Sequence, residues 1–347
     1  MFKELAKERK LPELQSREEM LEILFSEEYG YLPKKPEELS FEAEEVYPSC
    51  NCGGMAKEHR ITVKGKIDGR EFSFPFYSVI PVKEGKYPFF VHINFRDGRP
   101  DRYMPTEELI DEGFAVLSFC YNDVTKDNGD FTDGLAGVLY PDGVRGKKDA
   151  GKIAMWAWAA HRVLDWAETN EKLDMKRSIV CGHSRLGKTA LFAGATDERF
   201  AVSYSNDSGC SGASITRGKR GETVEVITRV FPFWFCEDYR KYADREYEMP
   251  FDQHYLIGAI APRYACIGSA TEDEWADPEA EQFACYAASG AYKAHGIDGY
   301  IGADRYARTG ESFFEGNIGY HLREGVHYFS RRDWLKLIEF VRAKGLA

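Results

Sequence analysis

The sequence predicts an α/β protein, a three-layer sandwich in which one mostly parallel β-sheet carries helices on both faces. Apolar runs of strand length alternate along the chain with segments of helical periodicity, the order that produces parallel strands joined by helices. Several of the runs are continuously apolar, which is typical of strands covered on both faces. No linker, repeat or low-complexity segment divides the chain. We therefore expect residues 1–347 to form a single domain, with residues 1–58 as a helical and irregular extension packed on it.

The expected elements begin with a charged helix over residues 1–30, which prolines close. Residues 59–83 alternate polar and apolar around a central Asp68-Gly69, which predicts a β-hairpin and hence an antiparallel start to the sheet. Two stretches, 125–150 and 209–242, show few regular elements. The remaining strands are expected at 87–95, 114–123, 178–184, 200–207 and 264–270. The remaining helices are expected at 106–113, 148–170, 186–197, 255–263, 280–296 and 331–345.

The composition excludes several kinds of partner. A net charge of −11 argues against nucleic acid, because phosphate recognition needs a basic face. No apolar run reaches 18 residues, so no membrane-spanning helix is expected. The first residues lack the apolar segment of a signal peptide, which predicts a cytoplasmic protein, or a secreted one whose signal is missing from the sequence. Hydrophobic residues make up 43%, enough for a large core without a second chain. We expect a monomer, an expectation that does not follow from the composition.

The eight cysteines are expected to be reduced thiols. Cys120, Cys181 and Cys266 lie within apolar runs, where a thiol behaves as a small hydrophobic group. Cys50 and Cys52 are too close together for an easy bridge, and no second pair stands at the spacing of a zinc site.

Residues 182–189, GHSRLGKT, fit two catalytic motifs. They match the phosphate-binding pattern G-x-x-x-x-G-K-[ST], but such loops favour small residues at the variable positions, where this chain has the bulky His183 and Arg185. The stretch also follows an apolar strand and precedes a helix, the context of a nucleophile elbow with Ser184 at the turn. The generic G-x-S-x-G pattern is half met, because the second glycine is Gly187, three residues after the serine. We favour the elbow.

A nucleophilic serine of this kind needs an acid and a histidine base later in the chain. His327 lies in a loop just before the final helix, where this arrangement places its base, and His321 is the alternative. Asp273 directly follows one expected strand, and Asp207 ends the expected strand before it. Both therefore stand at the carboxyl edge of the sheet, where ligands bind. The residues themselves leave both aspartates open as the acid.

Further motifs extend this pattern along the chain. After G-x-S-R-x-G-K come NDSGCSGASITR…GET (206–223), DQHYLIGAIAPR (252–263), EDEWADPEAE (272–281) and GVHYFSRRDW (325–334). Together they resemble, in the same order, the blocks of the glucuronoyl esterases, carbohydrate esterase family fifteen. The resemblance implies an α/β-hydrolase fold that cleaves the ester between 4-O-methyl-glucuronate on xylan and an alcohol of lignin. It also implies a small-molecule or oligosaccharide uronate ester as the substrate, and no metal or cofactor.

The resemblance assigns catalytic roles residue by residue. Ser184 corresponds to the nucleophile and His327 to the base. Arg185 resembles the residue whose backbone N–H and guanidinium stabilise the oxyanion; the alternative for it is a surface salt bridge. The family places its catalytic acid at either of two positions in the chain, which correspond here to Asp207 and Asp273. Many members carry glutamate at the first of these positions, and the aspartate of this chain is one methylene shorter and so reaches less far. We therefore favour Asp273.

Three further residues, Lys188, Glu222 and Trp275, resemble those that hold the hydroxyls and the ring of the sugar. Lys188 could instead be a charge on a helix surface, and Trp275 a core residue. Two alternatives to a glucuronoyl esterase remain. One is an esterase of the same fold that acts on another uronate or on an acetyl ester, and the other is a non-catalytic carbohydrate-binding homologue.

Overall fold

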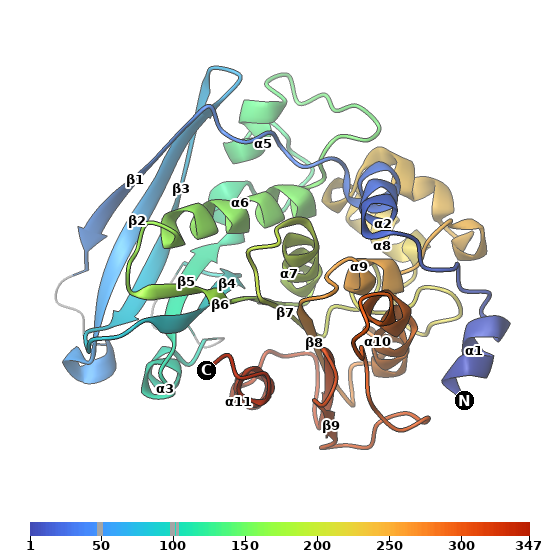
Figure 1. The fold of residues 1–347 in the computed structure, drawn as a ribbon. Helices are drawn as coiled ribbons and strands as arrows, with labels where there is room; N and C mark the ends of the chain where they lie inside the picture. Colours follow the sequence, from blue (N-terminus) through green and yellow to red (C-terminus); the bar gives the residue numbers. More distant parts are fainter. Residues whose placement is uncertain (47–50, 98–100, 102–103) are drawn as a thin grey trace.

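A ten-stranded sheet forms the centre of the computed structural model, which describes residues 1–46, 51–97, 101 and 104–347 (Figure 1). Its strand order is β1-β2-β3-β5-β4-β6-β7-β8-β10-β9. The strands from β5 to β10 in this order are parallel, whereas β1, β2, β3 and the short β9 pair antiparallel with their neighbours. The strands are β1 Glu38–Glu45, β2 Ala56–Ile67, β3 Arg70–Pro81, β4 Tyr87–Asn94, β5 Ala115–Cys120, β6 Leu173–His183, β7 Val202–Asn206, β8 Tyr264–Ala270, β9 Ser312–Phe313 and β10 Ile318–Arg323.

Helices cover both faces of this sheet, as predicted (Figure 1). The buried side chains of α6, α7, α9 and α10 share one core, and those of α3 and α11 form part of a second core on the other face. In the part of the chain that the structure describes, no helix combines the length and the apolar character needed to cross a membrane. The helices are α1 Phe2–Glu8, α2 Arg17–Leu24, α3 Thr106–Asp111, α4 Tyr121–Val124, α5 Gly134–Leu139, α6 Lys152–Ala167, α7 Arg185–Thr196, α8 Val224–Val230, α9 His254–Gly258, α10 Pro278–Lys293 and α11 Arg331–Ala343.

Strand β4 shows how the sequence produces these layers. Phe89, Val91 and Ile93 point into the core that includes α6. Phe90 points the other way, into the core that includes Trp334 of α11. Successive side chains of a strand face opposite sides, so a continuously apolar strand supplies both cores. The prediction from the apolar runs is confirmed.

The predicted helix over residues 1–30 is wrong, because the chain forms two helices there. Pro12 separates α1 from α2, since proline has no N–H and cannot continue a helix. Ser16 starts α2 with a capping box, in which its Oγ accepts the N–H of Glu19 and the Glu19 carboxylate accepts the N–H of Ser16 at 3.1 Å. A π-helical turn over Phe25–Tyr29 follows.

Two other predicted segments also differ. The helix expected over 255–263 ends at Gly258, and Pro262, which lies within the expected range, has no N–H with which to continue it. The stretch 209–242 contains α8, a short helix that Thr223 caps by accepting the N–H of Val226. The first difference concerns the end of an element, the second adds one short helix to a stretch expected to have few regular elements, and both leave the sheet unchanged.

Three strands are not predicted by the sequence: β1, the two-residue β9 and β10. In β1, apolar residues alternate with glutamates on an exposed edge, so the segment is too polar to be recognised as a strand. Residues 38–45 of the N-terminal extension are thus part of the sheet. In β10, Gly319, His321 and Arg323 interrupt the apolar run, although the whole strand is buried.

The cysteines agree with the expectation of reduced thiols. Within the described residues they are free and buried: Cys52, Cys120, Cys181, Cys210, Cys236, Cys266 and Cys285. Cys50 lies outside the described residues.

Candidate active site

Ser184 occupies the sharp turn between β6 and α7. Its backbone has φ +57° and ψ −127°, a strained conformation that costs a non-glycine residue roughly 1–3 kcal/mol. The Ser184 N–H donates to the carbonyl of Asn206 on β7 at 2.8 Å, which ties the turn to the next strand. Gly182 allows the helix to approach, because a Cβ there would lie 2.2 Å from the Leu186 carbonyl oxygen. This is the geometry of a nucleophile elbow rather than of a phosphate-binding loop.

Four predicted site residues follow four neighbouring strands. Strands β6, β7, β8 and β10 are adjacent and parallel, so their carboxyl ends meet at one edge of the sheet. Ser184, Asp207, Asp273 and His327 come from the loops after these strands, in that order. The topology therefore brings together residues that are far apart in the sequence, at the edge where open α/β sheets bind ligands.

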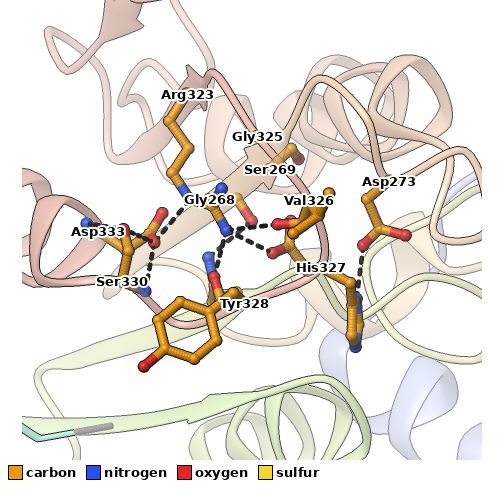
Figure 2. A network of polar contacts seen from close by, with 12 residues as sticks. Gly268, Ser269, Asp273, Arg323, Gly325, Val326, His327, Tyr328, Ser330 and Asp333 are labelled. Atoms are coloured by element: carbon orange, nitrogen blue, oxygen red, sulfur yellow. Dashed lines mark hydrogen bonds and ion pairs between the residues drawn. The ribbon is translucent and has the colours of Figure 1, made fainter. Parts of the chain in front are cut away.

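His327 is paired with Asp273. Its Nδ1 donates to the Asp273 Oδ2 at 2.6 Å (Figure 2), and the other carboxylate oxygen accepts the N–H of Ala276 at 3.1 Å. Burial acts to raise the pKa of Asp273, but the hydrogen bond and the charge of His327 outweigh it, and the pKa is lowered. Asp273 is therefore ionised at neutral pH and orients the imidazole, whose Nε2 is left to accept a proton.

The imidazole of His327 lies against the residue that precedes the serine. The ring centroids of His183 and His327 are 4.4 Å apart. His183 is buried, and its Nδ1 lies 2.7 Å from the Oδ1 of Asn206. Burial and the neighbouring His327 lower the pKa of His183 to about 3, so it stays neutral near pH 7. His327 and Ser184 thus belong to one site.

His321, the alternative base, lies elsewhere. It is buried within β10, with its Nε2 3.0 Å from the hydroxyl of Tyr204. Burial lowers its pKa to about 4. The structure therefore favours His327 over His321 as the base.

Asp207, the alternative acid, is fully buried and pairs with Arg323 rather than with the histidine. Its Oδ2 accepts from the Arg323 Nη2 at 3.1 Å, and among the described residues its Oδ1 has no hydrogen-bond partner. Burial and the nearby Glu281 carboxylate raise the pKa of Asp207 well above its usual value. Asp207, Asp273 and His327 each offer one possible ligand atom, and these three atoms lie within 4.8 Å of one another, close enough to share a metal ion. Such an ion would have to compete with the His327–Asp273 hydrogen bond.

Arg185, the residue after the serine, is held by a network that the sequence did not reveal. Its Nη1 donates to the Oδ2 of Asp127, which also accepts from the hydroxyl of Tyr121 at 3.0 Å. The Asp127 Oδ1 accepts the indole N–H of Trp234 at 2.6 Å. The guanidinium carbon lies 4.7 Å from the Trp234 ring centroid and 5.5 Å from that of Phe231. Arg185 is therefore a fixed, partly buried charge.

The three predicted sugar-binding residues lie together. Lys188 is buried on α7, where its Nζ donates to the Ser208 carbonyl and lies 3.7 Å from the Oε2 of the buried Glu222. The Glu222 N–H donates to the carbonyl of Trp275 at 3.1 Å, and the Lys219 Nζ donates to the carbonyls of both residues. The Trp275 side chain is exposed, at 54%. Lys188 is thus not a surface charge, and Trp275 is not a core residue.

Sequence reasoning missed Asp127, Trp234 and Arg323. Asp127 and Trp234 come from the irregular stretches 125–150 and 209–242, and no spacing links them to Arg185. Arg323 ends β10, which the sequence did not predict. The one available signal for Arg323 is its place shortly before His327 in the chain.

Three features define the class of α/β-hydrolases: a mostly parallel sheet with this strand order, a strained serine between a strand and a helix, and a histidine–aspartate pair at the same edge. The chain belongs to the glucuronyl esterase family. The model of that family described as "Glucuronyl esterase, fungi" matches residues 63–296.

Individual relatives agree with this assignment. A carbohydrate esterase, MZ0003, from an unknown prokaryotic organism is 41% identical over 236 residues, which are 67% of this chain and 54% of that protein. The 4-O-methyl-glucuronoyl methylesterase of Podospora anserina is 28% identical over 269 residues, 74% of this chain and 51% of that protein. The chain thus spans about half the length of these curated relatives. Among solved structures, a promiscuous CE15 esterase from a marine bacterial metagenome matches with a TM-score of 0.84 and 32% identity, covering 94% of this chain and 90% of that one.

Proposed function

We propose that the chain hydrolyses esters of glucuronate and 4-O-methyl-glucuronate, as in lignin–xylan cross-links, through an acyl intermediate on Ser184. The observation that carries the proposal is the pairing of His327 with the buried Asp273 beside the elbow, because it supplies a base for the serine hydroxyl. The family match and the relatives named 4-O-methyl-glucuronoyl methylesterases support a uronate as the acyl group.

Acylation uses the His327–Asp273 pair as a proton carrier. The Ser184 Oγ attacks the ester carbonyl while the His327 Nε2 takes its proton. The Asp273 carboxylate keeps the imidazole in the tautomer with the proton on Nδ1 and stabilises the imidazolium that forms. The imidazolium then gives its proton to the departing alcohol. A water molecule, activated by the same histidine, hydrolyses the uronoyl ester on Ser184.

Arg185 supplies the donors for the negative oxygen of the tetrahedral intermediate. Its backbone N–H lies in the first turn of α7, where the helix offers no acceptor for it. Its guanidinium, held by Asp127, adds a positive charge that is already in place before the reaction. Lys188, Glu222 and Trp275 form the adjoining group of residues that we assign to the sugar hydroxyls and ring.

The Asp127→Asn variant tests this role of Arg185. Asparagine fills the same volume but removes the charge that holds the guanidinium. Because a hydrogen bond to a charged group contributes about 1.5–3 kcal/mol, we expect kcat to fall about 10- to 100-fold. Steady-state hydrolysis of benzyl glucuronate measures the effect.

Asp165→Asn is the matched control, since Asp165 accepts from Arg162 and Arg199, away from the site. It should leave kcat unchanged. If Asp127→Asn and Asp165→Asn lower kcat equally, the loss is a general effect of breaking an aspartate–arginine pair. That result would contradict the role of Asp127.

A panel of esters tests the proposed function itself. Benzyl glucuronate, an acetyl ester and a feruloyl ester are compared at equal enzyme concentration, and we expect the glucuronate ester to have the highest kcat/KM. Activity on the acetyl ester alone would favour the same-fold esterase of different specificity. Absence of turnover with every ester would favour the carbohydrate-binding homologue.

The finer description of the partners is also a proposal. We infer that the substrate is a small molecule or oligosaccharide and that the chain acts as a monomer without binding nucleic acid or membranes. The net charge of −11 and the burial of a large core within one chain support this.

A further inference from the structure

The guanidinium of Arg323, at the end of β10, lies against the loop that carries His327 (Figure 2). Its Nη2 donates to the carbonyl oxygens of Val326, at 3.0 Å, and of Tyr328, the residues on either side of His327. Its Nη1 donates to the carbonyl of Glu324 at 3.2 Å. One side chain therefore binds three carbonyls of a loop without regular secondary structure.

The same guanidinium is anchored by two buried carboxylates. Its Nε donates to the Asp333 Oδ2 at 2.7 Å and its Nη2 to the Asp207 Oδ2 at 3.1 Å. The Asp333 Oδ2 in turn accepts hydrogen bonds from the N–H of Ser330, at 2.8 Å, and from the hydroxyl of Ser330, at 2.6 Å. These bonds belong to the capping box that starts α11. Arg323 thus connects the histidine loop, the start of α11 and the end of β7 in one buried network.

Other contacts also hold the two ends of the loop. At its far end Phe329 is buried, with its ring centroid 4.5 Å from that of Trp334. The Gly325 N–H donates to the Thr271 hydroxyl at 3.2 Å, and its carbonyl accepts the N–H of Glu272 at 2.9 Å. The next two side chains face solvent, with Val326 58% exposed and His327 41% exposed. Exposed side chains contribute little packing that could fix a loop. The Arg323 hydrogen bonds act on the backbone of this exposed stretch, at the carbonyls of Val326 and Tyr328.

We propose that Arg323 is a positioning residue that holds His327 in the orientation Asp273 and Ser184 require. Asp207 is then a hydrogen-bond partner of Arg323 rather than the acid of the triad. The effect on rate rests on the proposed function, whereas the His327–Asp273 hydrogen bond can be followed without any reaction.

The planar guanidinium is essential to this role. It presents five N–H donors in a rigid fork, so it can bind carbonyls and carboxylates on several sides at once. A lysine at position 323 keeps the positive charge beside Asp207 but offers one nitrogen in place of three. Arg323→Lys therefore separates the hydrogen bonds to the loop from the charge pair.

We expect Arg323→Lys to lower kcat about 100-fold, because a displacement of about 1 Å in a catalytic group has an effect of this size. KM should change by less than about twofold, since sugar contacts are untouched. Hydrolysis of benzyl glucuronate by the full chain measures both constants. A kcat within about twofold of the wild type would overturn the proposal, because the charge alone would then suffice.

Arg217→Lys is the matched control. Arg217 is also buried, pairs with Asp252 at 3.1 Å, and donates to the carbonyls of Phe251 and Met249. This substitution should lower Tm to a similar extent as Arg323→Lys while leaving kcat unchanged. A loss of kcat in both variants would show a general effect of weakened buried pairs and would overturn the positioning role.

The Nδ1 proton of His327 gives a second readout by NMR. In the wild type it should resonate far downfield, because it is held in a short hydrogen bond to Asp273. We expect the signal to broaden or move upfield in Arg323→Lys and to stay in place in Arg217→Lys. An unchanged signal in Arg323→Lys would overturn the proposal. The two proposals can fail separately. If the signal changes in Arg323→Lys but the wild type does not hydrolyse glucuronate esters, the positioning role is supported and the proposed function is rejected.

A measurement on the wild type covers the case in which Arg323→Lys does not fold. With 15N-labelled arginine, the two Nη groups of Arg323 should give separate resonances, since bonds to carbonyls and carboxylates on several sides prevent rotation. A single averaged resonance would show that the guanidinium does not hold the loop, and would overturn the proposal.

Discussion

The Ser184→Ala variant is expected to lose about 10⁶-fold in kcat, the size of effect seen when the nucleophile of a serine hydrolase is removed. The hydroxyl is the atom that becomes acylated, and no other group at the β6–α7 turn replaces it. Alanine accepts the φ of +57° at about the same strain as serine, and the N–H that donates to Asn206 is retained. The fold and Tm should therefore be unchanged.

Ser178→Ala is the control for this variant. Ser178 lies on the same strand and donates to the Arg199 carbonyl at 2.6 Å, far from the carboxyl end of β6. Its replacement should lower stability slightly and leave kcat as in the wild type. Residual esterase activity of Ser184→Ala near the wild-type level would mean that another group is the nucleophile.

The second largest effect is expected for Asp273→Asn, with a fall of about 10⁴-fold in kcat. The asparagine amide cannot stabilise the imidazolium, and it can donate to Nδ1 and so favour the wrong tautomer of His327. Asp207→Asn should lose about tenfold at most, because the amide oxygen can still accept from Arg323. The two variants are matched in chemistry and both sites are buried, so their kcat values on benzyl glucuronate can be compared directly. The reverse ranking would make Asp207 the acid.

The sequence allowed much of the site to be predicted, for physical reasons that can be named. Ser184 stands between an apolar strand and a helix, a local pattern that only a sharp turn satisfies. His327 follows from the chain order of the fold, since the base comes from the loop before the last helix. Even the unusual glycine spacing has a local cause, because Gly187 lies where a Cβ would meet Ser205 and Ser208 at 2.8 and 3.1 Å.

The choice between the two aspartates could not be made from the residues alone. Asp207 and Asp273 both follow buried strands, and pairing with His327 depends on which loop reaches the imidazole in space. Asp207 pairs with Arg323 instead of with the histidine. Arg323 lies on β10, which the sequence does not reveal as a strand because glycine and polar residues interrupt its apolar run. In the sequence, Arg185 lies 58 residues after Asp127, with α6 and β6 between them, so only the fold could show their contact.

The most direct test of the account is to find the uronoyl group on the enzyme. Wild-type protein mixed with benzyl glucuronate is quenched in acid within the first turnovers and digested with trypsin. The serine lies in the peptide 178–185, together with Ser178, and fragmentation in the mass spectrometer distinguishes the two. We predict one glucuronoyl ester on Ser184 and none on Ser178. A glucuronoyl group on any other residue, or hydrolysis that proceeds at the wild-type rate in the Ser184→Ala variant, would contradict the account.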